Sequence, residues 1–337
     1  MNQIPRRAGL AWSHRRRLRP FGVVPAAFAF AVALALAGWV SVVSGELRAA
    51  QIDWSSAAFA DNFTSAGGMA RLDGSFIFEL GAFEPGFVPA AENVSEWAGK
   101  WRVLDRTAYN ATTRFFASSA LLESNTGAFA TGRQAYIWGY GGTAAREWIL
   151  ISSSGWKWPA AGGLALPATW AVGEADAAGI LVGAVNGAGF HMMTERVASG
   201  SPPALSGEAW RTLYFSKEQR SDAAVSGWDA DPDRDGRGNA LEFALGALPL
   251  EPSPANAPEI LITTDETGSS LTLSVSKLAN RAVRYRAEAS SDLRAWRSDA
   301  QAVETLEDSP EALRARAGAP VNPGSPNFIR LRVEVIE

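Results

Sequence analysis

Short runs in which apolar and polar residues alternate make up much of the chain. In the run FIFEL, Phe76, Phe78 and Leu80 point to one side, as in a strand with one buried face. The residues between them, which include Glu79, point to the other side. Similar runs, bounded by Gly, Pro, Ser or Asn, lie at 134–140, 147–158 and 181–192. The pattern predicts an antiparallel β-sandwich over residues 51–215.

One segment of this region has helical rather than alternating spacing. In NVSEWAGKWRVLD, Ser95 can cap a helix, and Trp97, Trp101 and Leu104 then fall on one face. We therefore expect a small helix packed on the aromatic-rich β domain.

A second β-rich region occupies residues 256–337. Its last run, FIRLRVEVI, places Ile329, Leu331 and Val333 opposite the intervening arginines. Several such runs in this length are typical of an immunoglobulin-like or fibronectin-like sandwich. Prolines in LPLEPSPANAP resist both helix and central strand, so residues 216–255 are expected to form a linking segment. The predicted fold class is mostly β, with two β-sandwich domains joined by this segment.

Residues 1–50 have the pattern of an export signal. Seven of the 31 basic residues lie there, and Arg19 is followed by the apolar run FGVVPAAFAFAVALALAGWVSVVSG. The run approaches the length that spans a bilayer, so a retained signal anchor is the alternative to a cleaved signal peptide. We expect the chain to be exported and to be secreted, periplasmic or at the cell surface. Its contact with the membrane is then limited to an uncleaved N-terminal segment.

Composition excludes several function classes. The formal net charge is −4, and the part after residue 50 is more acidic still, so no nucleic-acid partner is expected. The chain has no cysteine, which excludes disulfides and a thiol nucleophile. His191 is the only histidine after the N-terminal segment, and no catalytic motif is recognisable.

The linking segment contains the strongest chemical signal, DADPDRDGRGNALEFALG. Counted from Asp231, it fills every ligand position of an EF-hand calcium loop, and Gly236 permits the sharp turn. The alternative is a solvated acidic turn. The predicted metal ligands are five side chains and, at the seventh position, a carbonyl oxygen, from Asp231, Asp233, Asp235, Arg237, Asn239 and Glu242.

The surroundings of this loop favour a static site over a calcium switch. A sensor EF-hand has a helix before the loop, whereas Gly227 precedes this one and Pro232 lies inside it. Only the exit, NALEFALGAL, has helical spacing, and it should stop near Gly246. No second loop is present to pair with the first. We therefore expect a structural Ca²⁺ that orders the segment between the two β domains.

The segment WDADPDRDGRGNALEFALGALPLEP resembles one that recurs in exported modular bacterial proteins. Its loop is similar to dockerin and thrombospondin type 3 calcium repeats. In such proteins a terminal β-module follows, with a stretch similar to YRAEASSDLRAW, and the leading domain is generally uncharacterised. The resemblance implies a surface or secreted protein and implies no activity.

Tryptophan provides a competing hypothesis, because 11 of the 13 lie after residue 50. Indole faces stack on sugar rings and also fill protein cores. Trp138, Trp156 and Trp158 are the candidates for a platform that binds extracellular polysaccharide. A glycosidase is a third possibility, but it needs two facing carboxylates, and the sequence singles out no pair. A non-enzymatic exported protein is the expectation.

Overall fold

A computed structural model of the chain describes residues 49–65, 70–142, 145–161, 166–252, 256–266, 268–322 and 327–336. They belong to one compact unit, Leu47–Glu337, and are mostly β. Of the segment assigned to the export signal or anchor, residues 1–48 lie outside the described residues, and Ala50 already begins a strand. Within the described ranges, no helix is both long enough and apolar enough to cross a bilayer. The domain boundaries proposed from the sequence stay predictions.

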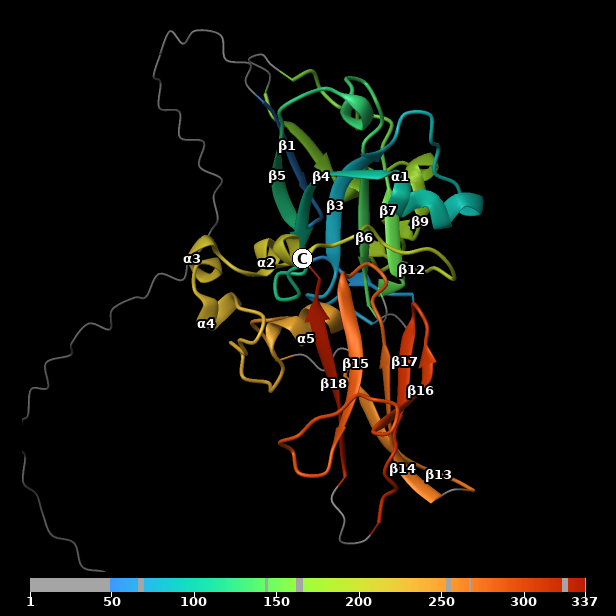
Figure 1. Cartoon of the computed structure of the whole chain (residues 1–337). Coiled ribbons are helices and arrows are strands. Elements are labelled where there is room, and N and C mark those ends of the chain that lie inside the picture. Colours follow the sequence, from blue (N-terminus) through green and yellow to red (C-terminus); the bar gives the residue numbers. More distant parts are fainter. Residues whose placement is uncertain are drawn as a thin grey trace, which may run out of the picture. The chain divides into compact units, whose positions relative to one another are not determined.

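A large antiparallel sheet forms the centre of the leading part (Figure 1). Its strand order is β12-β7-β6-β3-β4, and β9 also pairs with β7. Because β4 pairs only with β3, it is an edge strand of this sheet among the residues described. The strands are β3 (Ile77–Phe83), β4 (Trp101–Ala108), β6 (Tyr136–Gly141), β7 (Glu147–Ile151), β9 (Ile180–Val182) and β12 (Glu195–Arg196).

A three-stranded sheet, in the order β5-β1-β8, packs against one face of the central sheet. Ile52 and Trp54 of β1 join Phe78 and Ile149 of the central sheet in one hydrophobic core, here called the first core. The sandwich expected for this part is therefore present, although β1 and β8 are parallel. The strands are β1 (Ala50–Ser55), β5 (Ala117–Leu122) and β8 (Ala168–Ala171), and a smaller sheet contains β2 (Asn62–Phe63), β10 (Ala184–Val185) and β11 (Met192–Met193).

The opposite face of the central sheet is also buried, which the alternation in FIFEL did not predict. Ile77 and Phe83 of β3 lie in a second core with aromatic residues from β6, β7 and the helices. Every residue of β3 is buried as a result. The helices of the leading part are η1 (Ala91–Glu96), α1 (Trp97–Lys100), η2 (Gly127–Phe129), η4 (Val172–Glu174), η5 (Ala177–Gly179) and α2 (Gly207–Tyr214).

The prediction of a helix over residues 93–105 is wrong for the second half of that range. Helical structure ends at Lys100, and β4 begins at Trp101. Pairing with β3 accounts for the difference, because Trp101 lies opposite Phe83 and the ladder continues to Ala108. Trp97 and Trp101 still enter the same core, from the helix and from the strand.

Glu79 is a buried charge on the tryptophan-rich face of β3. Its carboxylate accepts hydrogen bonds from Trp101 Nε1 at 2.6 Å, Arg106 Nε at 2.6 Å and Tyr140 Oη at 3.0 Å. Burial raises the pKa of Glu79, while the Arg106 charge opposes that rise. The ion pair of Glu79 and Arg106 joins β3 to β4 within the apolar face, and the hydrogen bond from Tyr140 joins β3 to β6.

After α2 the chain forms three further helices and then a second sandwich. A four-stranded sheet, β13-β14-β17-β16, and a two-stranded sheet, β15-β18, enclose a third core that contains Leu273, Leu313 and Ile329. The elements are α3 (Lys217–Arg220), α4 (Ala223–Ser226), α5 (Asn239–Leu245), β13 (Glu259–Asp265), β14 (Gly268–Ser276), β15 (Val283–Ser290), β16 (Val303–Asp308), β17 (Ala312–Ala317) and β18 (Phe328–Val335).

Replacing Glu79 tests the buried pair. Glu79→Gln is expected to lower the free energy of unfolding by about 3 kcal/mol, because Arg106 is left without its counter-charge beside an apolar core. The matched control is Glu84→Gln, because Glu84 pairs with Lys100 and Arg102 at a partly exposed position. The control should lose less than about 1 kcal/mol in urea-induced unfolding. Equal losses in the two variants would show that burial of the pair is unimportant.

Candidate metal centre

The aspartate segment folds into a tight loop between α4 and α5. One carboxylate oxygen from each of Asp231, Asp233 and Asp235 lies within 4.8 Å of the other two. Gly236 has a φ of +91°, in the left-handed region, as the sixth position of the predicted loop requires. The structure therefore brings together the three aspartates that the spacing identified.

Backbone amides occupy one oxygen of each aspartate. Gly236 N donates to Asp231 Oδ2 at 3.0 Å, and Asp235 N donates to Asp233 Oδ1 at 3.1 Å. Arg237 N donates to Asp235 Oδ1 at 2.9 Å. The other oxygens of the first two, Asp231 Oδ1 and Asp233 Oδ2, are buried and have no hydrogen-bond partner among the described residues. These amides hold the carboxylates in place and leave oxygens available to a cation.

Two buried side chains of α5 supply further unpartnered oxygens. Glu242 is 0% exposed, and neither of its carboxylate oxygens has a hydrogen-bond partner in the described part of the chain. Asn239 is also fully buried, and its amide nitrogen donates to the carbonyls of Val225 and Gly227 at 2.9 and 2.7 Å. Those bonds fix the orientation of the Asn239 amide, whose Oδ1 is likewise without a partner.

Without a counter-charge, burial and mutual repulsion make the ionised forms of these carboxyl groups unfavourable. Burial, together with the charges of Asp233, Asp235 and Asp231, raises the pKa of Glu242 to about 8. Burial is also the main cause of a raised pKa at Asp233. Arg237 Nε lies 3.7 Å from Asp235 Oδ2, and its charge partly opposes the rise in the pKa of Glu242. A buried carboxylate needs a paired charge or a metal ion to stay ionised.

The helix that carries Glu242 agrees with the pattern NALEFALGAL. It begins at Asn239, ends at Leu245, and Gly246 follows with a φ of +73° as a left-handed C-cap. On the other side of the loop, α4 has only four residues and stops before Gly227, whose backbone is extended. The loop thus has a single turn of helix before it, unlike the long entering helix of a calcium sensor.

The residues that follow Glu242 join two of the three cores. Phe243 lies in the second core, and its ring centroid is 5.6 Å from those of Trp210 and Trp228. Leu245, two positions later, lies in the third core. Tyr285 Oη donates to the Ala244 carbonyl at 2.7 Å. The position of α5 therefore affects the packing of both β regions at once.

The tryptophans proposed as a sugar platform are buried. Trp138 is 0% exposed at the centre of the second core, and Trp156 and Trp158 pack with Trp170 in the first core. These three tryptophans therefore do not form a row of exposed indole faces. They pack in the protein cores instead. The sequence signal for this burial was that the neighbouring strands are apolar on both faces.

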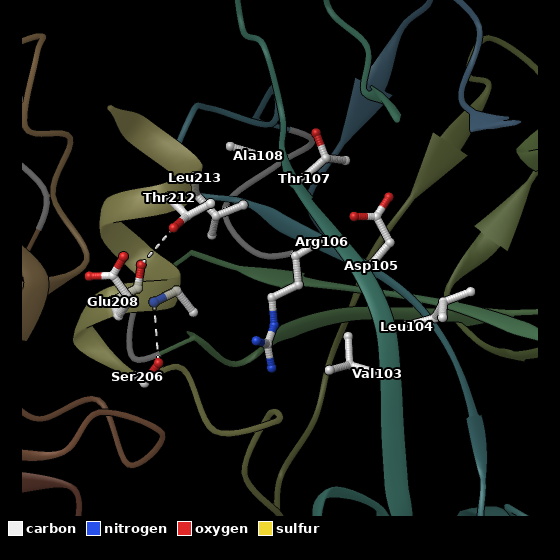
Figure 2. Close-up of a pocket in the computed structure, with 11 residues that line it drawn as sticks. Val103, Leu104, Asp105, Arg106, Thr107, Ala108, Ser206, Glu208, Thr212 and Leu213 are labelled. Atoms are coloured by element: carbon white, nitrogen blue, oxygen red, sulfur yellow. Dashed lines mark hydrogen bonds between the residues drawn. The ribbon is translucent and has the colours of Figure 1, made fainter. Parts of the chain in front are cut away.

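An open groove of about 560 Å³ lies between β4 and α2 (Figure 2). Arg106 extends into it, but its guanidinium is bound to Glu79. Two acidic side chains line the groove, Asp105 and Glu208, and their carboxylates do not face each other (Figure 2). Asp105 also accepts a hydrogen bond from Trp54 Nε1 at 2.8 Å. This pair does not have the facing arrangement that glycoside hydrolysis requires.

His191 makes hydrogen bonds to a neighbouring loop. Its Nε2 accepts a hydrogen bond from the Ala57 amide at 3.2 Å, and its own amide donates to the Asp61 carbonyl at 2.8 Å. Partial burial lowers the pKa of His191. The side chain therefore connects two loops in its neutral form.

Comparison with known proteins assigns no family. No protein-family model matches the chain, and no curated protein matches it. The interpretation of the centre depends on its own geometry.

The neutral form of His191 predicts a specific pH dependence. Because the folded-state pKa is below the ordinary value of 6.5, the unfolded chain binds a proton first as the pH falls. The free energy of unfolding should be unaffected by this group above about pH 6.5 and should decrease as the pH falls through the folded-state pKa. His191→Gln should remove that part of the decrease. The same pH profile in both proteins, measured by urea-induced unfolding, would contradict the assignment.

Proposed function

We propose that the loop and the start of α5 form a structural Ca²⁺ site in an exported, non-enzymatic modular protein. The ligands are the side chains of Asp231, Asp233, Asp235, Asn239 and Glu242, and the carbonyl oxygen of Arg237. The observation that carries this proposal is Glu242, a completely buried carboxylate that has no hydrogen-bond partner in the part of the chain that the structure describes and whose ionised form is opposed by the charges of three aspartates.

The donor set favours calcium over other metals. All six groups offer oxygen, and none offers the nitrogen or sulfur that zinc and copper sites use. Calcium accepts six to eight oxygen ligands in flexible geometry, whereas magnesium demands a compact octahedron and keeps its waters. A divalent cation would also offset part of the negative charge of the four carboxylates.

The role proposed for the ion is mechanical. It holds Glu242 at the loop, and Glu242 is followed by Phe243 in the second core and Leu245 in the third. Arg281 Nε donates to the Phe243 carbonyl at 3.2 Å and adds a contact from the loop before β15. A cation that fixes the start of α5 would thereby stabilise the connection between the two β regions.

Export would bring the site to a calcium concentration that is high enough to fill it. Isolated extracellular calcium modules bind in the range of roughly 0.1 to 1 mM, which is far above cytosolic calcium. The basic residues and apolar run within residues 1–50 support transport to a compartment with millimolar calcium. The resemblance to exported modular bacterial proteins agrees with that location.

Thermal unfolding in EDTA and in calcium tests the site. At a calcium concentration about ten times the dissociation constant, the free energy of unfolding should rise by about 1.4 kcal/mol. Glu242→Gln should lose most of this gain, because a neutral amide replaces the bidentate carboxylate. The matched control is Asp229→Asn, which removes a carboxylate at the same two-residue spacing but outside the loop.

The control variant should keep the full calcium response. If calcium leaves the melting temperature of the parent unchanged, or if Asp229→Asn and Glu242→Gln respond alike, the aspartates form a solvated turn and the proposal fails. Magnesium at the same concentration is expected to give a smaller shift.

A further inference from the structure

The strand β13 presents an apolar edge to solvent. It is the outermost strand of the four-stranded sheet and pairs with β14 alone among the described strands. All seven of its residues are exposed. Ile260, Ile262 and Leu261 are 47%, 62% and 51% exposed, although they are large aliphatic residues in the middle of the strand. Natural edge strands are usually protected by charge, proline or a covering segment, and the centre of β13 has none of these.

The isoleucines of β13 lie on the core side of their sheet. Ile260 is opposite Leu273, and residues opposite each other in a ladder share a face. Leu273 is completely buried in the third core, whereas no residue of β13 belongs to that core. The two-stranded sheet on the other side packs over β14 and β17 and leaves β13 uncovered. The strand is therefore positioned to receive another strand along its free edge.

We propose that the occupant is β13 of a second copy of this chain, paired antiparallel about a two-fold axis at Leu261. The central residues read Ile-Leu-Ile, which is symmetric about Leu261. Self-pairing in this register places Ile260 opposite Ile262 of the other copy, and Leu261 opposite its own equivalent. An isologous contact requires a surface that is complementary to itself, and this sequence satisfies that requirement. The two four-stranded sheets then form one continuous sheet.

Charge selects this register over its neighbour. If the axis passed through Ile262, Glu259 would lie opposite Asp265 of the other copy, and Ile260 and Leu261 would lie opposite threonines. Like charges directly opposite one another destabilise a strand pair. With the axis at Leu261, Glu259 lies opposite Thr263, and both copies keep their acidic residues at the ends of the contact. The proposal involves no residue of the metal centre and does not depend on calcium.

Sedimentation equilibrium on the protein obtained by expressing the full chain tests the contact. The parent is expected to show a concentration-dependent dimer. Leu261→Lys should raise the dimer dissociation constant by about tenfold or more, because it places two ammonium groups opposite one another. The matched control is Leu306→Lys on β16, the other edge strand of the same sheet, where the leucine is 43% exposed. The control should leave the dimer unchanged.

A cysteine scan identifies the register. The chain contains no native cysteine, so a single introduced thiol reports only on its own position. Under mild oxidation Leu261→Cys should give a disulfide-linked dimer, and Ile262→Cys should give little, because only the first lies opposite its own equivalent. A parent that stays monomeric up to its solubility limit overturns the proposal. A dimer that is disrupted by Leu306→Lys and not by Leu261→Lys, or that crosslinks at residue 262 and not at 261, also overturns it.

Discussion

The repulsion among four carboxylates at the start of α5 is the constraint on which the organisation of this protein depends. Glu242 is completely buried and has no hydrogen-bond partner among the described residues, and the charges of three aspartates make its ionised form unfavourable. The same helix supplies Phe243 to the second core and Leu245 to the third. An ionised Glu242 at the junction of two cores requires a counter-charge there. The calcium ion that we propose would satisfy this requirement with the oxygen ligands that the loop presents.

Local patterns in the sequence predicted that the three aspartates of the loop lie close together, because this geometry depends on residues that are near one another in the chain. The two-residue spacing of Asp231, Asp233 and Asp235 brings their oxygens within 4.8 Å of one another. The helical spacing after Gly238 predicted α5 and its end at Gly246. Alternation likewise identified β3 and β18 as strands. Each of these features is determined by backbone geometry over a few residues.

Features that depend on distant segments were not predictable in this way. The alternation in β3 indicated two faces, but it gave no information that Trp97 and Trp210, from helices α1 and α2, would pack on the second one. Residues 101–108 have a spacing compatible with a helix, and only their ladder with β3 makes them a strand. The burial of Trp138, which removes it from any sugar platform, has the same origin. The partner of Glu79 was also hidden, since Arg106 lies on a different strand.

Amide hydrogen exchange with and without calcium tests the central claim most directly, because it reports on each segment separately. If the ion stabilises the junction through α5, calcium should slow exchange in the loop, in α5, and in the segments that contact α5 from both cores, α2 and the start of β15. Protection confined to residues 231–237, or no change at all, would contradict the proposal that this site connects the two β regions.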